Sequence, residues 1–154
     1  MDRRRLDQLT NNIQHELPPN YEELKKSINR NSNWRERLAA IEELGKWKHE
    51  RTIDVLLHRM HNDAVYKVQE AAFQKLSNFG EKVQLPPRNK FELIKDANKV
   101  LFRIKKSLPA DHTYEAFKEK LKNMRLDLYD TYEGDKGEDF DQWLKHAWET
   151  AKKK

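Results

Sequence analysis

The sequence predicts an all-α protein, an α-α superhelix built as a right-handed stack of about eight helices in antiparallel hairpins. Apolar residues recur at the three- and four-residue spacing of amphipathic helices along almost the whole chain. Only 4 glycines and 5 prolines interrupt 154 residues, which is too few for a turn-rich sheet. Residues 33–47 and 65–79 also resemble each other, and such internal repetition is typical of stacked helical units.

The apolar spacing sets the expected order of elements. Pro18 and Pro109 end helices, because proline disfavours helix in the residue before it. Residues 133–137 contain two glycines and are predicted to be a loop. The predicted helices cover residues 2–16, 20–28, 33–47, 50–61, 65–79, 89–108, 114–132 and 140–151.

Two helix starts have the spacing of a capping box, in which a side chain at the cap and a Glu three residues later satisfy free backbone amides. These pairs are Asn20 with Glu23 and Asn33 with Glu36. A chain of 154 residues is expected to form one domain, residues 1–154. We expect two repeats over 31–107, with capping hairpins at 2–29 and 112–151, because end units of a helical stack must shield its core.

The two similar segments share a pattern of aromatic, alanine and bulky apolar positions. A pair of alanines lets two helices approach closely, while the larger residues around it fill the remaining space. The matching positions are Trp34 and Tyr66, Ala39 and Ala71, Ala40 and Ala72, Ile41 and Phe73, Leu44 and Leu76, and Trp47 and Phe79.

This pattern resembles the HEAT repeat family over residues 31–106. Asp63, Val68, Ala71, Ala72, Leu76 and Gly80 match the family motif in the second segment, and Arg37, Ala39, Ala40 and Leu44 match it in the first. Gln69 replaces a usual Arg, Asn31 replaces a usual Asp, and the repeat is shorter than the roughly 40–47 residues of HEAT units. The resemblance implies a scaffold whose second helices, here 50–61 and 89–107, line a concave binding face.

Composition limits which kinds of site and which kinds of protein remain possible. The net charge is +5, and the absence of cysteine excludes disulfides and thiolate metal sites. No signal peptide is visible, and no apolar run approaches the roughly 18 residues of a membrane span. We therefore expect a basic cytoplasmic protein without a membrane partner.

A basic stripe on the predicted helix 89–107 is the candidate binding surface. Its cations recur at helical spacing, and two arginines on helix 50–61 extend it; the candidates are Lys95, Lys99, Arg103, Lys106, Arg51 and Arg59. Such a stripe suits an acidic protein segment or nucleic acid phosphates, whereas the plain alternative is a solvated helix face. The expected partner is a protein. The alternative is DNA, bound as in HEAT-like DNA-repair glycosylases but without an assignable catalytic site.

Glu50, Asp54, His58 and His61 share one helical face, yet a metal site is not expected there. All ligands would come from a single helix, and no His-Glu-x-x-His motif is present, so a solvated polar face is the favoured interpretation. Glycine-rich phosphate loops and the Gly-x-Ser-x-Gly nucleophile motif are absent as well. The sequence therefore predicts a non-catalytic protein without a cofactor or a small-molecule substrate.

Overall fold

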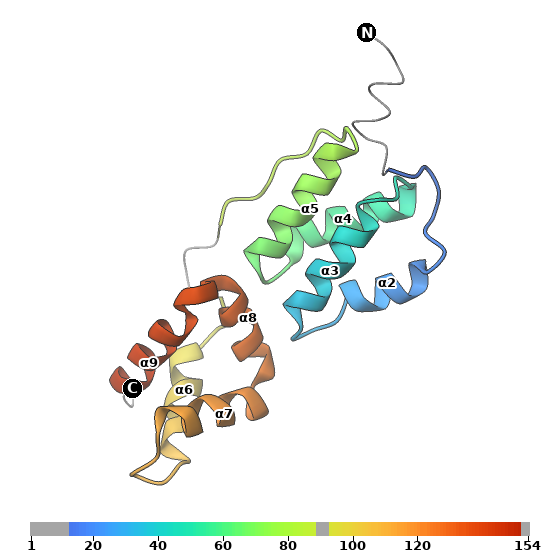
Figure 1. Cartoon of the computed structure of the whole chain (residues 1–154). Coiled ribbons are helices and arrows are strands. Elements are labelled where there is room, and N and C mark those ends of the chain that lie inside the picture. Colours follow the sequence, from blue (N-terminus) through green and yellow to red (C-terminus); the bar gives the residue numbers. More distant parts are fainter. Residues whose placement is uncertain (1–12, 89–92, 152–154) are drawn as a thin grey trace. The chain divides into compact units, whose positions relative to one another are not determined.

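The computed structural model describes residues 13–88 and 93–151 (Figure 1). Its regular elements are helices, and no named strand occurs among the described residues, so the all-helical prediction is confirmed. The chain forms two compact units, residues 1–87 and 88–154, and each is described by itself. No helix in the described ranges is both long and apolar enough to cross a membrane.

The first unit is built from helices in two rows. The helices are α2 (Tyr21–Ile28), α3 (Trp34–Leu44), α4 (Glu50–Asn62) and α5 (Tyr66–Asn78). α3 packs against α2 and α5, and α5 packs most extensively against α4. Because short connections join α3 to both α2 and α4, these two helices run antiparallel to α3 and therefore in the same direction as each other (Figure 1).

One alanine of each predicted pair is buried, whereas Ala39 is exposed and Ala71 is half-buried. Ala40 on α3 is 3% exposed and Ala72 on α5 is 0% exposed, and these two helices pack against each other. Their larger neighbours Leu44 and Leu76 are both fully buried in the same core. The repeated pattern therefore marks equivalent positions in the fold.

The chain before α2 differs from the expected helix 2–16. Residues 13–16 are not helical, and the rest of that prediction lies outside the described residues. The backbone amide of Gln14 donates to the carbonyl of Lys46 at 2.6 Å, and its carbonyl accepts from the amide of Lys48 at 2.6 Å. Extended pairing with the α3–α4 connection thus satisfies backbone groups that a helix would have bonded internally.

One of the two predicted helix caps is confirmed and the other is wrong. The Asn33 side chain accepts from the amide of Glu36 at 3.1 Å and donates to its carboxylate at 3.0 Å. Asn20 makes no side-chain cap bond. The carbonyl of Pro18 accepts from the amide of Tyr21 at 3.0 Å, so a turn leads into α2 instead.

An extended segment, residues 81–87, follows α5 and precedes the second helix of the second repeat that was expected from residue 89. Gly80 adopts φ +87°, a conformation that favours glycine, and ends the helical path. Val83 and Leu85 pack on the core of the first unit, and the Tyr66 hydroxyl donates to the carbonyl of Pro86 at 2.8 Å. The segment therefore runs back along α5 and covers it without forming a helix.

Thr52 on α4 places a hydroxyl in the core with no hydrogen-bond partner among the described residues. A buried polar group left unsatisfied costs about 1–3 kcal/mol. We expect Thr52→Val, which keeps the shape and removes the hydroxyl, to raise the free energy of unfolding in urea by about 1 kcal/mol. Unchanged or reduced stability would show that the hydroxyl is satisfied in solution.

The second unit packs helices around its own apolar core. The helices are α6 (Ala97–Lys106), α7 (Tyr114–Met124), α8 (Leu126–Lys136) and α9 (Phe140–Thr150). α6 contacts α7 and α9, and α8 contacts both α7 and α9. The buried apolar residues of this core are Ala97, Leu101, Ile104, Phe117, Leu121, Leu128, Tyr132, Phe140 and Leu144.

Three boundaries in this unit differ from the sequence prediction. α6 begins at Ala97 instead of residue 89, after Asp96 in a left-handed conformation with φ 60°. The expected helix 114–132 breaks at Arg125, whose guanidinium contacts both carboxylate oxygens of Asp127 at 3.0 Å. The expected loop 133–137 is helical up to Lys136, and Gly137 then ends α8 with φ 59°.

The boundary between the two units falls at residues 87 and 88, inside the segment expected to hold both repeats, 31–107. α6, expected to be the second helix of the second repeat, packs within the second unit. The single domain with capping hairpins at 2–29 and 112–151 stays a prediction.

Asp141 at the start of α9 is held by two donors. Lys118 Nζ lies 2.6 Å and the Tyr114 hydroxyl 2.8 Å from its Oδ1. The hydrogen bond from Lys118, followed by that from Tyr114, keeps the pKa of the Asp141 carboxyl below its usual 3.8. Burial, and then the bond to this carboxylate, raise the pKa of Tyr114 well above its ordinary value.

The lowered pKa of Asp141 predicts a pH dependence of stability. Its contribution is fully present above the unfolded-state pKa near 3.8 and is lost as pH falls through the lower folded-state value. Because the carboxylate is 64% exposed, solvent screening limits the contribution to about 1 kcal/mol or less. We expect Asp141→Asn to lower the free energy of unfolding at pH 7 and to have a smaller effect in acid. An undiminished difference at low pH would contradict this.

Candidate functional site: a groove between α2 and α4

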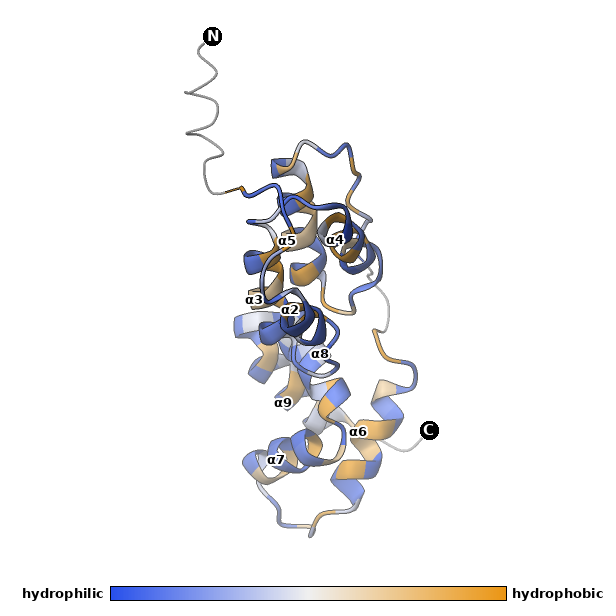
Figure 2. Cartoon of the chain, turned by 90° about the vertical axis from the view of Figure 1, so that its right-hand side faces the viewer, coloured by the Kyte–Doolittle hydropathy of each residue, from blue (hydrophilic) through white to orange (hydrophobic). Residues whose placement is uncertain are grey.

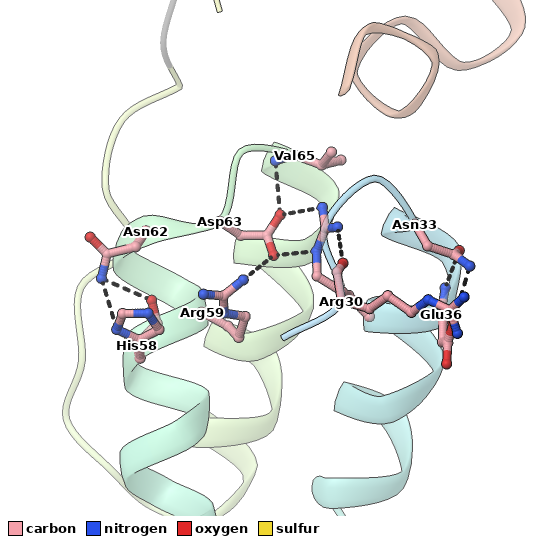
Figure 3. Close-up of polar contacts among 9 residues, drawn as sticks. Arg30, Asn33, Glu36, His58, Arg59, Asn62, Asp63 and Val65 are labelled. Atoms are coloured by element: carbon pink, nitrogen blue, oxygen red, sulfur yellow. Dashed lines mark hydrogen bonds and ion pairs between the residues drawn. The ribbon is translucent and has the colours of Figure 1, made fainter. Parts of the chain in front are cut away.

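A buried ion-pair cluster fixes the positions of α3, α4 and the start of α5 (Figure 3). Arg37 Nε lies 2.9 Å and Nη2 3.1 Å from the two carboxylate oxygens of Asp63. Arg59 Nη1 lies 3.3 Å from the same carboxylate, which also accepts from the amide of Val65 at 2.9 Å. The Asp63 side chain is 0% exposed, so a single buried carboxylate ties two helices to the turn that begins a third.

Arg37 also donates to the carbonyl of Arg30 at 2.8 Å, which ties the α2–α3 connection to the same cluster. This arrangement holds α2 and α4 on one side of α3 and α5. The cluster is structural: Arg37 and Asp63 pair inside the core, and Arg59, 16% exposed, contacts the same carboxylate.

A groove of about 620 Å³ lies between the parallel helices α2 and α4. This volume is within the range of about 300–1,000 Å³ that ligand sites occupy. Tyr21 is buried, Val55 is half-buried, and the other lining residues are exposed. The lining consists of Tyr21, Glu22, Lys25 and Asn29 from α2 and its end, and Arg51, Asp54, Val55 and His58 from α4.

The charged side chains of the groove make no ion pair or hydrogen bond with another described side chain. Opposite charges nonetheless occupy equivalent positions in the two helices: Glu22 and Arg51 lie in the first turns, and Lys25 and Asp54 follow one turn later. Two carboxylates and two cations therefore line the groove without neutralising each other by contact.

His58 contributes a ring to the far end of the groove. The Asn62 side-chain amide lies 3.3 Å from His58 Nδ1 and donates to the His58 carbonyl at 3.1 Å. Within the described ranges, no three His, Asp or Glu side chains come together as metal ligands.

The residues of the predicted basic surface fall in different units. Lys95, Lys99, Arg103 and Lys106 are all exposed and belong to the second unit, where Lys99 Nζ lies 3.8 Å from Asp96. Arg51 lines the groove of the first unit. Arg59 is 16% exposed and engaged with Asp63, so we leave it out of the candidate site.

The family model of HEAT repeats matches residues 21–87. These residues are thus similar to HEAT repeats, as the sequence pattern predicted. The match begins before the expected start at residue 31 and ends before the expected end at residue 106. It therefore includes α2 and the extended segment 81–87, and it excludes α6. No curated protein and no solved structure matches the chain.

The departures from the HEAT motif now have a physical reason. Arg37 of one repeat reaches the Asp63 that precedes the next, so this single pair links the two repeats. Asn31, in the place of an Asp, is exposed at the first end of this series. Gln69, in the place of an Arg, has no later repeat to reach, because the HEAT match ends at residue 87.

Sequence reasoning missed the α2 half of the groove. α2 was assigned to a capping hairpin, although it precedes α3 just as α4 precedes α5. Extending the repeat backwards from α4 places α2 in the same row, and this signal was available in the sequence.

Proposed function

We propose that the HEAT repeats are a non-catalytic scaffold that binds a segment of another protein in the α2–α4 groove. The observation that carries this proposal is the row of unpaired charged side chains on an open groove lined by α2 and α4. In HEAT-type stacks, rigid neighbouring helices create extended concave surfaces suited to this use. The mechanism is surface complementarity, with Tyr21 and Val55 as the apolar floor.

Selection of random peptides displayed on phage, with the full chain as target, tests this proposal. Lys25→Glu should weaken the binding of the selected peptides at least tenfold, because it replaces an attractive contact inside the groove with a repulsive one. Lys26→Glu is the matched control: it makes the same change on the neighbouring, exposed position of α2 outside the lining and should bind like wild type. Equal loss in both variants, or none in either, would place binding elsewhere.

A second candidate function is binding of a polyanion, such as DNA, by the basic stripe at α6. This function is favoured because Lys99, Arg103 and Lys106 on α6 and Lys95 just before it are exposed, and α6 itself contains no acidic residue, although Asp96 lies 3.8 Å from Lys99. Leu101 and Ile104 anchor the opposite face in the core, and Figure 2 shows hydrophobic and hydrophilic residues alternating along this helix. Such a surface would release counterions from a phosphate backbone.

Reversing Lys99 and Arg103 to Glu is expected to weaken binding of random-sequence duplex DNA by well over tenfold at low salt. The difference should shrink at high salt, because screening suppresses both the attraction and the new repulsion. The control carries Lys122→Glu and Lys145→Glu, which change the net charge equally on exposed residues of α7 and α9. Equal DNA affinity of wild type and the Lys99/Arg103 variant would leave the stripe as a solvated face.

A further inference from the structure

We infer that the α2–α4 groove selects an extended peptide carrying both an acidic and a basic residue around an apolar one, and that it rejects peptides of a single charge sign. This inference rests on the proposed function of the groove and names the chemistry of its occupant. This ligand preference differs from that of a basic HEAT surface, which attracts polyanions.

The charges of the lining carry the argument. Glu22 and Asp54 offset Lys25 and Arg51, so the groove has no net formal charge from these residues although the whole chain carries +5. None of the four is bonded to another described side chain, so each has its full capacity for a ligand. A peptide of one charge sign meets two attractive and two repulsive partners, whereas a mixed peptide can meet four attractive ones.

The acidic and basic side chains follow opposite orders along the two helices. Along α2 the acid Glu22 comes first and the base Lys25 follows, whereas along the parallel α4 the base Arg51 precedes the acid Asp54. An extended peptide points alternate side chains to opposite sides. A peptide lying between the two helices therefore faces an acid followed by a base on one edge, and a base followed by an acid on the other. A peptide that carries both an acidic and a basic side chain on each edge can pair with all four.

An apolar side chain of the bound peptide would lie on the floor of the groove. Tyr21 is 6% exposed and Val55 half-buried, so the floor between the helices is apolar while the rim is charged. An aliphatic or aromatic side chain on this floor excludes water from the flanking ion pairs, and removing water strengthens such charge interactions.

The test uses the full chain and three synthetic peptides with the same apolar residues and length. One carries only Glu as its charged residues, one only Lys, and one carries both, placed so that each edge of the extended peptide bears an acid and a base. We expect wild type to bind the mixed peptide about tenfold more tightly than either uniform peptide, since several exposed charge contacts change sign together. A preference for the Glu-only peptide, or no binding of the mixed peptide, would overturn the inference.

Two exposed substitutions remove the expected preference for the mixed peptide. Asp54→Lys leaves three cations and one acid in the groove, so the Glu-only peptide should bind as tightly as the mixed one, whereas Lys25→Glu should bring the Lys-only peptide to that level. Lys26→Glu, outside the lining, should keep the preference of wild type. If phage-selected peptides depend on Lys25 but are uniformly charged, the groove binds peptides and only this inference fails. If no selected peptide depends on Lys25, the proposed function itself fails.

Discussion

Asp63→Ala is expected to lower the free energy of unfolding of the first unit by about 3–5 kcal/mol, which is the cost of removing one partner from a buried ion pair. Arg37, with a side chain 6% exposed, would keep its charge in the core without a carboxylate. Arg59 would lose the same partner, and the amide of Val65 would lose its acceptor at the start of α5. Urea unfolding followed by circular dichroism measures this change.

The matched control for Asp63→Ala is Glu42→Ala, which removes the carboxylate of a surface pair. Glu42 lies 2.8 Å from Lys75 Nζ, but its side chain is 55% exposed, so the loss should stay within about 1 kcal/mol. A loss from Asp63→Ala no greater than that from the control would mean that the buried cluster does not hold the repeats together.

Ala72→Leu is expected to cost about 1–3 kcal/mol, because added methylenes in a packed core force neighbours from their preferred positions. Ala72 is 0% exposed on α5, and Ala40→Leu on α3, at 3% exposed, should have a comparable effect. The measurement is the melting temperature together with the urea midpoint of each variant.

Ala39→Leu is the control for these alanine variants, since Ala39 lies beside Ala40 on the same helix and is exposed. Surface substitutions of this kind usually change stability by no more than about 0.5 kcal/mol. Losses that do not distinguish Ala39 from Ala40 and Ala72 would contradict the packing described for α3 and α5.

The sequence predicted a helix feature correctly where the residues that form it lie within a few positions of each other or recur in the repeat. The Asn33 cap and the buried alanines depend on spacings of three to four residues or on the repeat, and both were readable. The break at Arg125 depends on the pairing of its guanidinium with Asp127, and no proline or glycine marks it. The late start of α6 follows a left-handed Asp96, a conformation that few non-glycine residues adopt and that sequence does not announce.

The binding surface was harder to predict because it joins residues from different helices. Arg59 has the spacing of a surface cation, yet Asp63 draws it into a buried cluster that includes Arg37, 22 positions earlier. The groove unites α2 and α4, which are separated in sequence by all of α3. Helical periodicity identifies one face of one helix and does not reveal which two faces share a groove.

Mapping a phage-selected peptide on the nitrogen-15-labelled full chain by amide chemical shifts tests the central claim most directly. We predict perturbed amides in residues 21–29 and 50–58, with the perturbations abolished by Lys25→Glu and retained in Lys26→Glu. Perturbations confined to the exposed face of α6, or spread along α3 and α5 without the groove, would contradict the account.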